Sequence, residues 1–245
     1  MTAEPIGPAR RTRADRARQV ADVLRQQVVR GAFPDAVLPG EPLLVAEFGV
    51  SRNTVREALD VLRDEGLIDR LPGVGTVVRN EKYAHGIDQL RGLAETLCEH
   101  GEVSNEVRVA SLVRPPATVA RRLRVPDGDS VVYVERLRRL GGLPLSLDLT
   151  YLVREVGEPL LAQDLAGTDI FTLIERVSGQ GLGTARLQME AVNADAHSAA
   201  LLSVPRGAAL LVVERLSHLA DGRPVDLEYI RFRGDRFVMS AELLR

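Results

Sequence analysis

The sequence contains a single cysteine, a single lysine and no long run of apolar residues. Because Cys98 has no partner in the chain, an intramolecular disulfide is excluded, which suits a reducing compartment. We expect Cys98 to pack as a small apolar side chain rather than to act as a redox sensor. No stretch reaches the roughly eighteen apolar residues of a membrane helix, and the polar, arginine-rich N-terminus is unlike a signal peptide. These absences predict a soluble, cytoplasmic protein with no membrane partner.

Net charge is also small. The 32 basic and 34 acidic residues leave a formal charge of −2, which argues against a protein generally coated with nucleic acid. The charge is unevenly placed, however, because residues 1–30 hold seven arginines and only three acidic residues. We expect residues 1–17 to form an arginine-rich arm ahead of the first helix. Such an arm can contact DNA phosphates; the alternative is a disordered tail that only aids solubility.

Motifs for metal binding, cofactors and hydrolysis are missing as well. The histidines His85, His100, His197 and His218 are not spaced with a second ligand as zinc or iron requires. The glycine-rich segment 179–183 does not continue as a phosphate-binding loop, and no motif supports Ser-His-Asp chemistry. The sequence therefore predicts no metal, no cofactor and no catalytic residue.

The segment 48–63 is the most informative part of the sequence. Gly49 permits the left-handed backbone of a tight turn, and Ser51 is a suitable N-cap for a following helix. An apolar stripe at helical spacing is formed by Val55, Ala58, Leu59 and Leu62. The other face carries Arg52 and Arg56 one turn apart, in the half of the helix that usually meets DNA bases. This pattern is typical of a helix-turn-helix; the alternative is a surface helix with a solvated, charged face.

The flanking segments favour the first interpretation. Helices are predicted over residues 18–30 and 42–48. Residues 65–71 turn out of the recognition helix into a strand, which leads to a glycine-rich tip at 72–75 and a returning strand at 76–78. Three helices followed by a two-stranded hairpin form a winged helix.

Residues 18–79 resemble the DNA-binding domain of the GntR family of bacterial transcription regulators. The matching residues are Leu38-Pro39, Ala46–Arg52, Thr54–Leu59, Leu62, Glu65–Leu67 and Gly73–Val78. The resemblance implies that Arg52 and Arg56 read bases in the major groove and that Gly73, at the wing tip, approaches the minor groove. Ser51 and Thr54 then lie near the DNA backbone, where Thr54 holds a phosphate.

Two further positions matter in this resemblance. Asn53 is expected to add a DNA contact beside the two arginines. The family usually has an arginine at position 42 that contacts DNA, and this chain has Pro42. Proline is acceptable in the first turn of a helix, so we expect the fold to be kept and one contact to be lost.

A second domain is predicted after a polar linker at residues 80–86. It contains a repeat, in which Val125–Leu137 is echoed by Val204–Leu216 at an offset of 79 residues. Each copy reads as a short helix (117–123 and 196–202), a turn, a strand, a hairpin and a second strand. Further elements are expected as strands at 106–113 and 186–192 and as helices at 87–100 and 170–177. Two copies are too few for a solenoid, so we predict a pseudo-symmetric α+β domain whose two hairpins share one antiparallel sheet.

This second part, residues 87–245, resembles the UTRA effector domain of the HutC subfamily of GntR regulators, whose fold is similar to chorismate lyase. The resemblance is carried by the Glu-Arg-Leu strands, the Gly-x-Pro hairpins and the ending Tyr229–Phe237. It implies an antiparallel-sheet domain that binds a small-molecule effector and dimerises.

Several residues are candidates for effector binding. Arg136 and Arg138 share one face of a strand, where two guanidiniums repel unless an anion or an acidic partner lies between them. The alternative is a solvated outer face of the sheet. The resemblance implies that these two arginines hold a phosphate of the effector in related regulators. It also implies that Asp148 and Asp226 bond the polar part of the ligand, with Phe232 beside them.

The chain departs from the phosphate-binding pattern at the start of a helix. Relatives have Ser-x-Tyr there, and this chain has Asp169 and Phe171. A carboxylate repels a phosphate, and phenylalanine lacks the hydroxyl. We therefore expect an effector that is not a simple phosphosugar, with a carboxylate or a cationic group as alternatives.

Together these features predict a homodimeric repressor that binds double-stranded operator DNA and responds to a small molecule. An enzyme with a lyase-like pocket, an activator and an effector-blind regulator are the alternatives. The chain is too short for the aminotransferase-like domain of some GntR proteins, and its one lysine lies in the linker.

Overall fold

The computed structural model describes residues 8–33, 35–79, 82–97 and 100–243. The chain forms two compact units, one that ends at Ala84 and one that begins at His85. Cys98 and the first seven residues of the expected arm lie outside the described residues.

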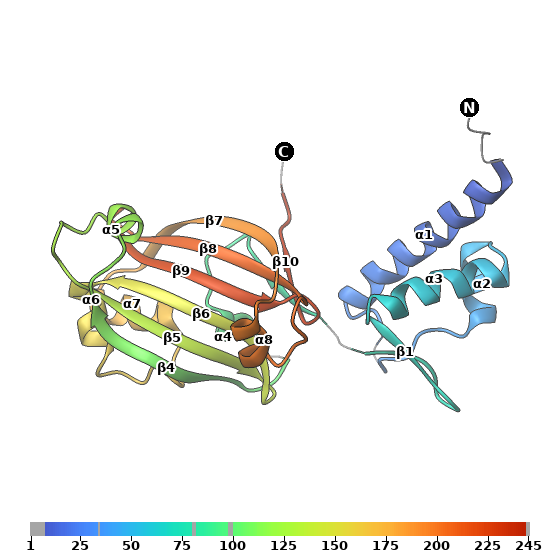
Figure 1. Cartoon of the computed structure of the whole chain (residues 1–245), viewed down its shortest axis with the longest axis horizontal. Helices are drawn as coiled ribbons and strands as arrows, with labels where there is room; N and C mark the ends of the chain where they lie inside the picture. The colour runs from blue at the N-terminus through green and yellow to red at the C-terminus, as the bar shows by residue number, and fades with distance from the viewer. Residues whose placement is uncertain (1–7, 34, 80–81, 98–99, 244–245) are drawn as a thin grey trace. The chain divides into compact units, whose positions relative to one another are not determined.

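The N-terminal unit is a winged helix (Figure 1). Its elements are α1 (Pro8–Val29), α2 (Glu41–Phe48), α3 (Arg52–Asp64), β1 (Ile68–Leu71) and β2 (Gly75–Val78). The apolar stripe predicted for the recognition helix is buried against α1, with Val55, Ala58 and Leu62 fully enclosed. β1 pairs antiparallel with β2, and the connector adds a bridge from Val37 to Val77. The predicted order of three helices and a hairpin is confirmed.

The first helix is longer than predicted. It begins at Pro8, so residues 8–17 of the expected arm are helical, and the prediction of a helix that starts at residue 18 is wrong. Proline is favoured at the first position of a helix. Tertiary contacts then hold the extra turns, because Ala17 is buried and Arg13 pairs with Glu57 of α3 at 2.7 Å.

The C-terminal unit is built on one antiparallel sheet, which over the described residues has six strands in the order β4-β5-β6-β9-β8-β7 (Figure 1). The strands are β4 (Val103–Val113), β5 (Val131–Leu140), β6 (Leu143–Val153), β7 (Leu182–Asn193), β8 (Ala209–Leu219) and β9 (Pro224–Arg233). The two repeat hairpins, β5–β6 and β8–β9, meet where β6 pairs with β9. The prediction that both hairpins share one antiparallel sheet is confirmed.

Helices cover both faces of this sheet. They are α5 (Ala117–Leu123), α6 (Arg154–Leu160), α7 (Ile170–Ser178) and α8 (Ala196–Leu202). The outer face, which carries Val131 and Leu137 of β5, packs against α5 and α8. The inner face, which carries Val132 and Val134, packs against α6 and α7. Since side chains alternate along a strand, Arg136 and Arg138 also belong to the inner face.

Two local predictions at the start of this unit are wrong. Residues of the expected linker form β3 (Tyr83–Gly86), which pairs with β10 (Phe237–Ser240). The helix predicted over residues 87–100 is reduced to α4 (Leu93–Leu97). The reason is that the backbone before α4 bonds to distant segments, as in the bond from Ile87 N to the Ser240 carbonyl. The predicted strands at 106–113 and 186–192 are both longer in the structure, as β4 and β7.

Candidate DNA-binding surface and effector cavity

The start of α3 is fixed by its N-cap. The Ser51 hydroxyl accepts a hydrogen bond from Thr54 N at 3.2 Å and lies 2.8 Å from the Thr54 hydroxyl. Before it, Gly49 adopts φ 60°, the left-handed turn that the sequence predicts. Thr54 is buried, so its hydroxyl serves the cap and does not face outward like its neighbours. Its assignment as a phosphate contact therefore stays a prediction, with this geometry against it.

The residues expected to read DNA lie on the exposed side of the helix. Arg52, Asn53 and Arg56 are all exposed, with 65% of the Arg52 side chain and 52% of the Arg56 side chain accessible. Gly73 is exposed at the tip of the wing with φ 79°, a conformation that glycine adopts without strain. Pro42 lies in the first turn of α2, as the sequence predicts, and cannot donate a hydrogen bond there.

Glu41, which sequence analysis did not single out, holds the arginines of this surface together. Its carboxylate accepts hydrogen bonds from Arg56 Nε at 3.0 Å, Arg52 Nε at 3.2 Å and Arg70 Nη2 of the wing at 3.3 Å. Partial burial of Glu41 favours its neutral form, but the hydrogen bonds and charges of the arginines outweigh this effect and lower its pKa. One carboxylate thus orients cations from the recognition helix and the wing.

In the C-terminal unit, most of the predicted effector residues lie on the inner face of the sheet. Arg136, Arg138, Asp148, Asp226 and Phe232 come from three strands, β5, β6 and β9, and each is at most 2% exposed. The alternative that the two arginines lie on a solvated outer face is therefore wrong. A buried cluster of this kind is stable only if each charge has partners.

Arg138 and Asp148 form a close ion pair. Arg138 Nη2 lies 2.6 Å from Asp148 Oδ2, and the Ser146 hydroxyl donates to Asp148 Oδ1, also at 2.6 Å. Burial favours the neutral carboxyl, but the charges of Arg138 and Arg136 and the Ser146 bond lower the pKa of Asp148. Asp148 is therefore ionised at neutral pH.

A second buried ion pair lies on the other hairpin, β8–β9. Arg215 of β8 bonds to Glu228 of β9, which also accepts from the Thr150 hydroxyl at 2.9 Å. Asp226 accepts a bond from the Ser217 hydroxyl at 3.2 Å. Burial and the nearby charge of Glu228 raise the pKa of Asp226 well above its ordinary value.

Several guanidinium N–H groups of the cluster are buried but unused. Arg136 Nε and Nη2, Arg138 Nη1 and Arg215 Nε find no hydrogen-bond partner among the described residues. Arg136 keeps one long bond, from Nη1 to the Leu165 carbonyl at 3.4 Å. Its desolvation and the nearby Arg138 lower its pKa, although an arginine stays protonated at neutral pH. Buried donors without acceptors are costly, and a ligand can supply the acceptors.

The start of α7 covers the cluster. Phe171 is buried and its ring lies under Arg215, with 4.2 Å between the guanidinium carbon and the ring centroid. Asp169 caps α7 and accepts from Phe171 N at 3.0 Å. Phe232 stacks on Phe237 with centroids 3.9 Å apart, so it forms an apolar wall at the inner face.

A cavity of about 260 Å³ opens beside Arg215, between the segment 85–91 and the start of β7. His85 at its edge is buried and lies 2.8 Å from the Thr96 hydroxyl. Burial and the charges of Arg215 and Arg138 lower the pKa of His85 to about 4, so the imidazole is neutral. Among the described residues, no group of three or more His, Cys, Asp or Glu side chains is placed to hold a metal ion.

Both units match known families. Residues 16–78 match the bacterial regulatory proteins of the gntR family, and residues 99–238 match the UTRA domain. The chain belongs to the GntR family and carries a UTRA domain. It is a DNA-binding transcriptional regulator, in a family of regulators rather than enzymes.

Several relatives of this GntR regulator span nearly its whole length. The HTH-type transcriptional regulator Rv0792c of Mycobacterium tuberculosis is 30% identical over 233 residues, covering 93% of this chain and 85% of the relative. The HTH-type transcriptional repressor NagR of Bacillus subtilis is 27% identical over 221 residues, covering 89% and 90%. The crystal structure of PhnF from Mycobacterium smegmatis has a TM-score of 0.67 at 22% identity and covers 92% of this chain and 99% of that chain, which shows a shared fold.

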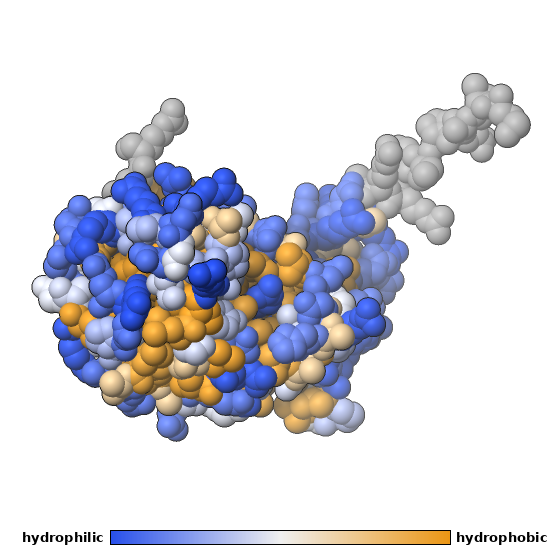
Figure 2. Space-filling view, turned by 60° about the vertical axis from the view of Figure 1, so that its left-hand side comes forward, coloured by the Kyte–Doolittle hydropathy of each residue, from blue (hydrophilic) through white to orange (hydrophobic). Residues whose placement is uncertain are grey.

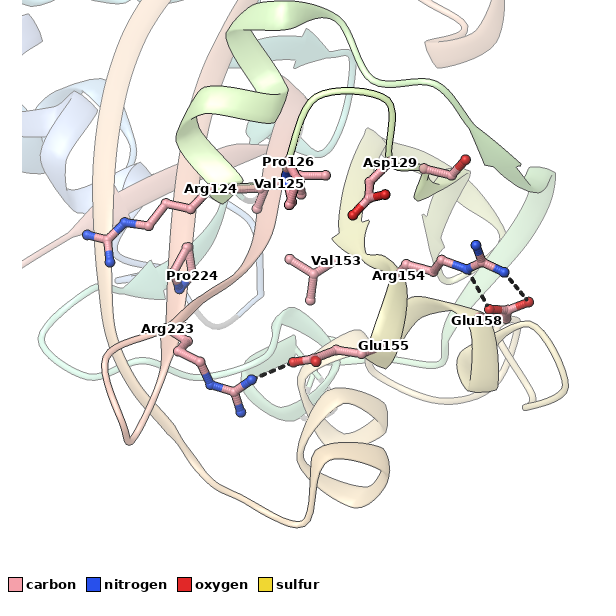
Figure 3. Close-up of a pocket in the computed structure, with 12 residues that line it drawn as sticks. Arg124, Val125, Pro126, Asp129, Val153, Arg154, Glu155, Glu158, Arg223 and Pro224 are labelled. Carbon is pink, nitrogen blue, oxygen red and sulfur yellow. Dashed lines mark hydrogen bonds and ion pairs between the residues drawn. The ribbon is translucent and has the colours of Figure 1, made fainter.

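The UTRA domain also has a larger hollow, of about 590 Å³, away from the arginine cluster (Figure 3). It lies where the end of α5, the start of α6 and the β8–β9 turn meet. Four of its charged side chains form two ion pairs, Arg154 with Glu158 and Arg223 with Glu155. None of the residues predicted to bind the effector is among the described residues that line it, and none lines the smaller cavity, which borders the cluster only at Arg215. These two ion pairs are exposed, unlike the buried pairs of the arginine cluster.

Arg215 and Glu228 of the UTRA domain were missed by sequence analysis, although a signal was present. Arg215 lies 79 residues after Arg136, so it is the same position of the second repeat. The 79-residue offset of the repeat relates candidate residues as well as strands, and adding it to the position of Arg136 would have identified Arg215. No comparable signal exists for Glu41, whose three arginine partners lie 11, 15 and 29 residues away.

Proposed function

We propose that this GntR regulator is a homodimeric repressor that leaves its operator when a small molecule binds beside the inner-face arginines of the UTRA domain. Two recognition helices, one from each protomer, enter successive major grooves of a two-fold symmetric operator with half-sites about one helical turn apart. Arg52 and Arg56 contact base edges, and Asn53 adds a contact beside them. Gly73 lets the wing approach the minor groove closely.

The observation that carries the proposal is the contrast between two sets of arginines. Arg52 and Arg56 are exposed and held side by side by Glu41, as a surface that meets DNA requires. Arg136 and Arg138 are buried, with N–H groups that no described residue accepts. The first set fits a large anionic polymer at the surface, and the second fits a small polar ligand inside the domain.

Apolar side chains on the edge strands of the UTRA sheet support a homodimer. Val107, Val109 and Leu112 of β4 and Met189 of β7 are exposed. Figure 2 shows apolar residues gathered on one face of this domain. Because β4 and β7 are opposite edges of the sheet, these side chains form two separate groups. Exposed apolar side chains mark association surfaces, and a two-fold pair would bury the same group on both copies.

The effector we propose is not a simple phosphosugar. The Asp169 carboxylate caps α7 and its negative charge acts on Arg136 and Arg138, and Phe171 has no hydroxyl to bond a phosphate. Among the relatives, MngR of Escherichia coli is named a mannosyl-D-glycerate transport/metabolism system repressor and is 28% identical over 222 residues. That name supports repression and a carbohydrate-related effector here.

No described helix is long and apolar enough to cross a membrane.

Effector binding must favour a dimer geometry in which the two winged helices no longer fit successive grooves. The effector can shift this equilibrium only by its difference in affinity for the two geometries. By reciprocity, operator DNA must weaken effector binding by the same factor.

The test begins with the full-length protein and a random duplex library, from which bound sequences are selected at several salt concentrations. We expect an inverted repeat to emerge. A thermal-shift screen of metabolites then identifies ligands that raise the melting temperature, and a gel-shift titration shows whether they release the operator. A protein with no preference over random competitor DNA at any salt concentration contradicts the proposal.

A further inference from the structure

The hollow of about 590 Å³ lies at a place that the sequence repeat of the UTRA domain supplies twice (Figure 3). In the first copy α5 ends there and β6 passes into α6; in the second copy α8 ends beside the end of β9. Leu123 and Leu202, 79 residues apart, are the last residues of the two helices. The residues that follow them, Arg124 and Ser203, both adopt φ 54°. The two copies can therefore be compared position by position.

The strand registers identify the residue that differs most between the copies. Val153 of β6 pairs with Val131 of β5. In the second copy, Leu210 of β8 stands 79 residues after Val131, and its partner on β9 is Arg233. Arg233 is therefore the equivalent of Val153.

In the second copy this arginine covers the end of the helix. Arg233 Nη1 donates to the Leu202 carbonyl at 3.3 Å, and its Nε and Nη2 donate to the Asp235 carboxylate at 3.0 and 2.7 Å. Only 13% of the Arg233 side chain is exposed. A guanidinium thus lies between a backbone carbonyl and a carboxylate.

In the first copy the same place has no guanidinium of its own. Val153, at the centre of Figure 3, has no donor group, and no described side chain donates to the Leu123 carbonyl. Glu155, the equivalent of Asp235, pairs instead with Arg223 of the β8–β9 turn at 2.6 Å, where both side chains are more than half exposed. The change from arginine to valine leaves a hollow with an apolar floor, which is formed by Leu123, Val125, Val153 and Pro224.

Asp129 adds a negative charge to this hollow. It lines the hollow at the position where the second copy has Ala208. Among the described residues its carboxylate has no ion pair and no side-chain hydrogen bond, because Arg154 pairs with Glu158 instead at 2.9 Å. The volume of about 590 Å³ is in the range of small-molecule sites.

We propose that this hollow is a second small-molecule site, which takes a ligand with a guanidinium, amidinium or ammonium group on an apolar body. The cationic group occupies the place that the Arg233 guanidinium holds in the second copy. There it donates to the Leu123 carbonyl and meets the charge of Asp129. The apolar body covers the floor of the hollow. This site goes beyond the proposed function and is separate from the inner-face arginines, whose unused N–H groups require acceptors instead.

The test uses benzamidine, a planar cation on an apolar ring, titrated into the full-length protein. Binding is followed by calorimetry and by the NMR shifts of backbone amides. We expect saturable binding with a Kd of roughly 1 mM or tighter, with the largest shifts in residues 123–130 and 153–158. Benzamide has nearly the same shape and no charge, and we expect it to bind about fivefold more weakly, since an exposed ion pair contributes about that factor.

Three variants locate the cationic group. Asp129→Asn should weaken benzamidine binding about fivefold, with no change for benzamide. The matched control is Asp127→Asn, because Asp127 is exposed in the same turn and does not line the hollow. Val153→Arg places the arginine of the second copy in the first, and it should abolish benzamidine binding because the protein then fills the hollow with its own guanidinium.

Four results overturn the proposal: no saturable benzamidine binding, benzamide that binds as tightly as benzamidine, equal affinities in Asp129→Asn and Asp127→Asn, or unchanged binding in a folded Val153→Arg. Should Val153→Arg fail to fold by circular dichroism, the two aspartate variants decide. The proposed function fails separately, by absent operator binding or absent effector release, because the benzamidine titration requires neither DNA nor the natural effector.

Discussion

Replacing Asp148 by asparagine should destabilise the UTRA domain by roughly 3–5 kcal/mol, the usual cost of breaking a buried ion pair by removing one partner. Arg138 Nη2 lies 2.6 Å from Asp148 Oδ2, and the two side chains are 3% and 1% exposed. The variant leaves Arg138 buried beside Arg136 without its carboxylate. With a urea m-value of about 2 kcal/mol/M, the unfolding midpoint would fall by roughly 2 M.

The measurement is urea unfolding of the full-length protein followed by far-UV circular dichroism. Because two units can unfold separately, hydrogen exchange of the β5 and β6 amides identifies the transition of the UTRA domain. The matched control is Glu155→Gln. Its pair with Arg223 has the same 2.6 Å separation, but the side chains are 53% and 62% exposed.

A surface pair of this kind contributes about 0–1 kcal/mol, so the Glu155→Gln midpoint should hardly move. Equal and small shifts in both variants would refute the argument that burial, rather than distance, decides the worth of these pairs.

The pH dependence gives a second check. Since the pKa of Asp148 is lowered from 3.8, its stabilisation is present above that value and is lost as the pH falls through the folded pKa. The difference between wild type and Asp148→Asn should therefore narrow in strong acid.

Three further outcomes are expected. Arg56→Ala should cost ~1–3 kcal/mol of specific operator affinity in a gel-shift titration. Arg63→Ala, at the far end of α3, is the control and should keep its affinity. If Arg56→Ala keeps full operator affinity, Arg56 does not contact the bases. Glu41→Gln should lower the ratio of specific to non-specific DNA affinity and steepen the salt dependence, because three arginines lose the carboxylate that orients them. Gly157→Ala should cost about 1–3 kcal/mol of UTRA-domain stability in urea, since the added Cβ would lie 2.6 Å from that of Val132; an unchanged midpoint would contradict this packing.

The winged helix could be predicted because its signals are local. Gly49, Ser51 and the apolar stripe of α3 act within a few residues of one another, and the structure reproduces the turn, the cap and the buried face. The antiparallel sheet followed from the repeat, since two similar hairpins can pair with each other. The start of α1 was mistaken because it depends on the Arg13–Glu57 pair, whose residues are 44 positions apart.

The candidate effector site was predicted in part. Arg136 and Arg138 could be placed on one face because alternation along a strand is a property of sequence. Whether that face is buried or solvated depends on α6 and α7 packing over it, and sequence analysis left both alternatives open. Burial then changes the chemistry, because it raises the pKa of Asp226 and leaves guanidinium N–H groups unused.

The sequence by itself determined the family and the order of the helices and strands. It also determined which residue types lie on the DNA-reading helix and on the inner face of the sheet. Each of these results rests on short-range patterns or on a repeat. Only the tertiary structure decided which charges meet: Glu41 with the arginines of α3 and the wing, Arg215 with Glu228, and Asp169 with Gly92. The physical reason is that electrostatic and packing energies depend on distance and burial in space, and these contacts join residues that lie 11 to 77 positions apart along the chain.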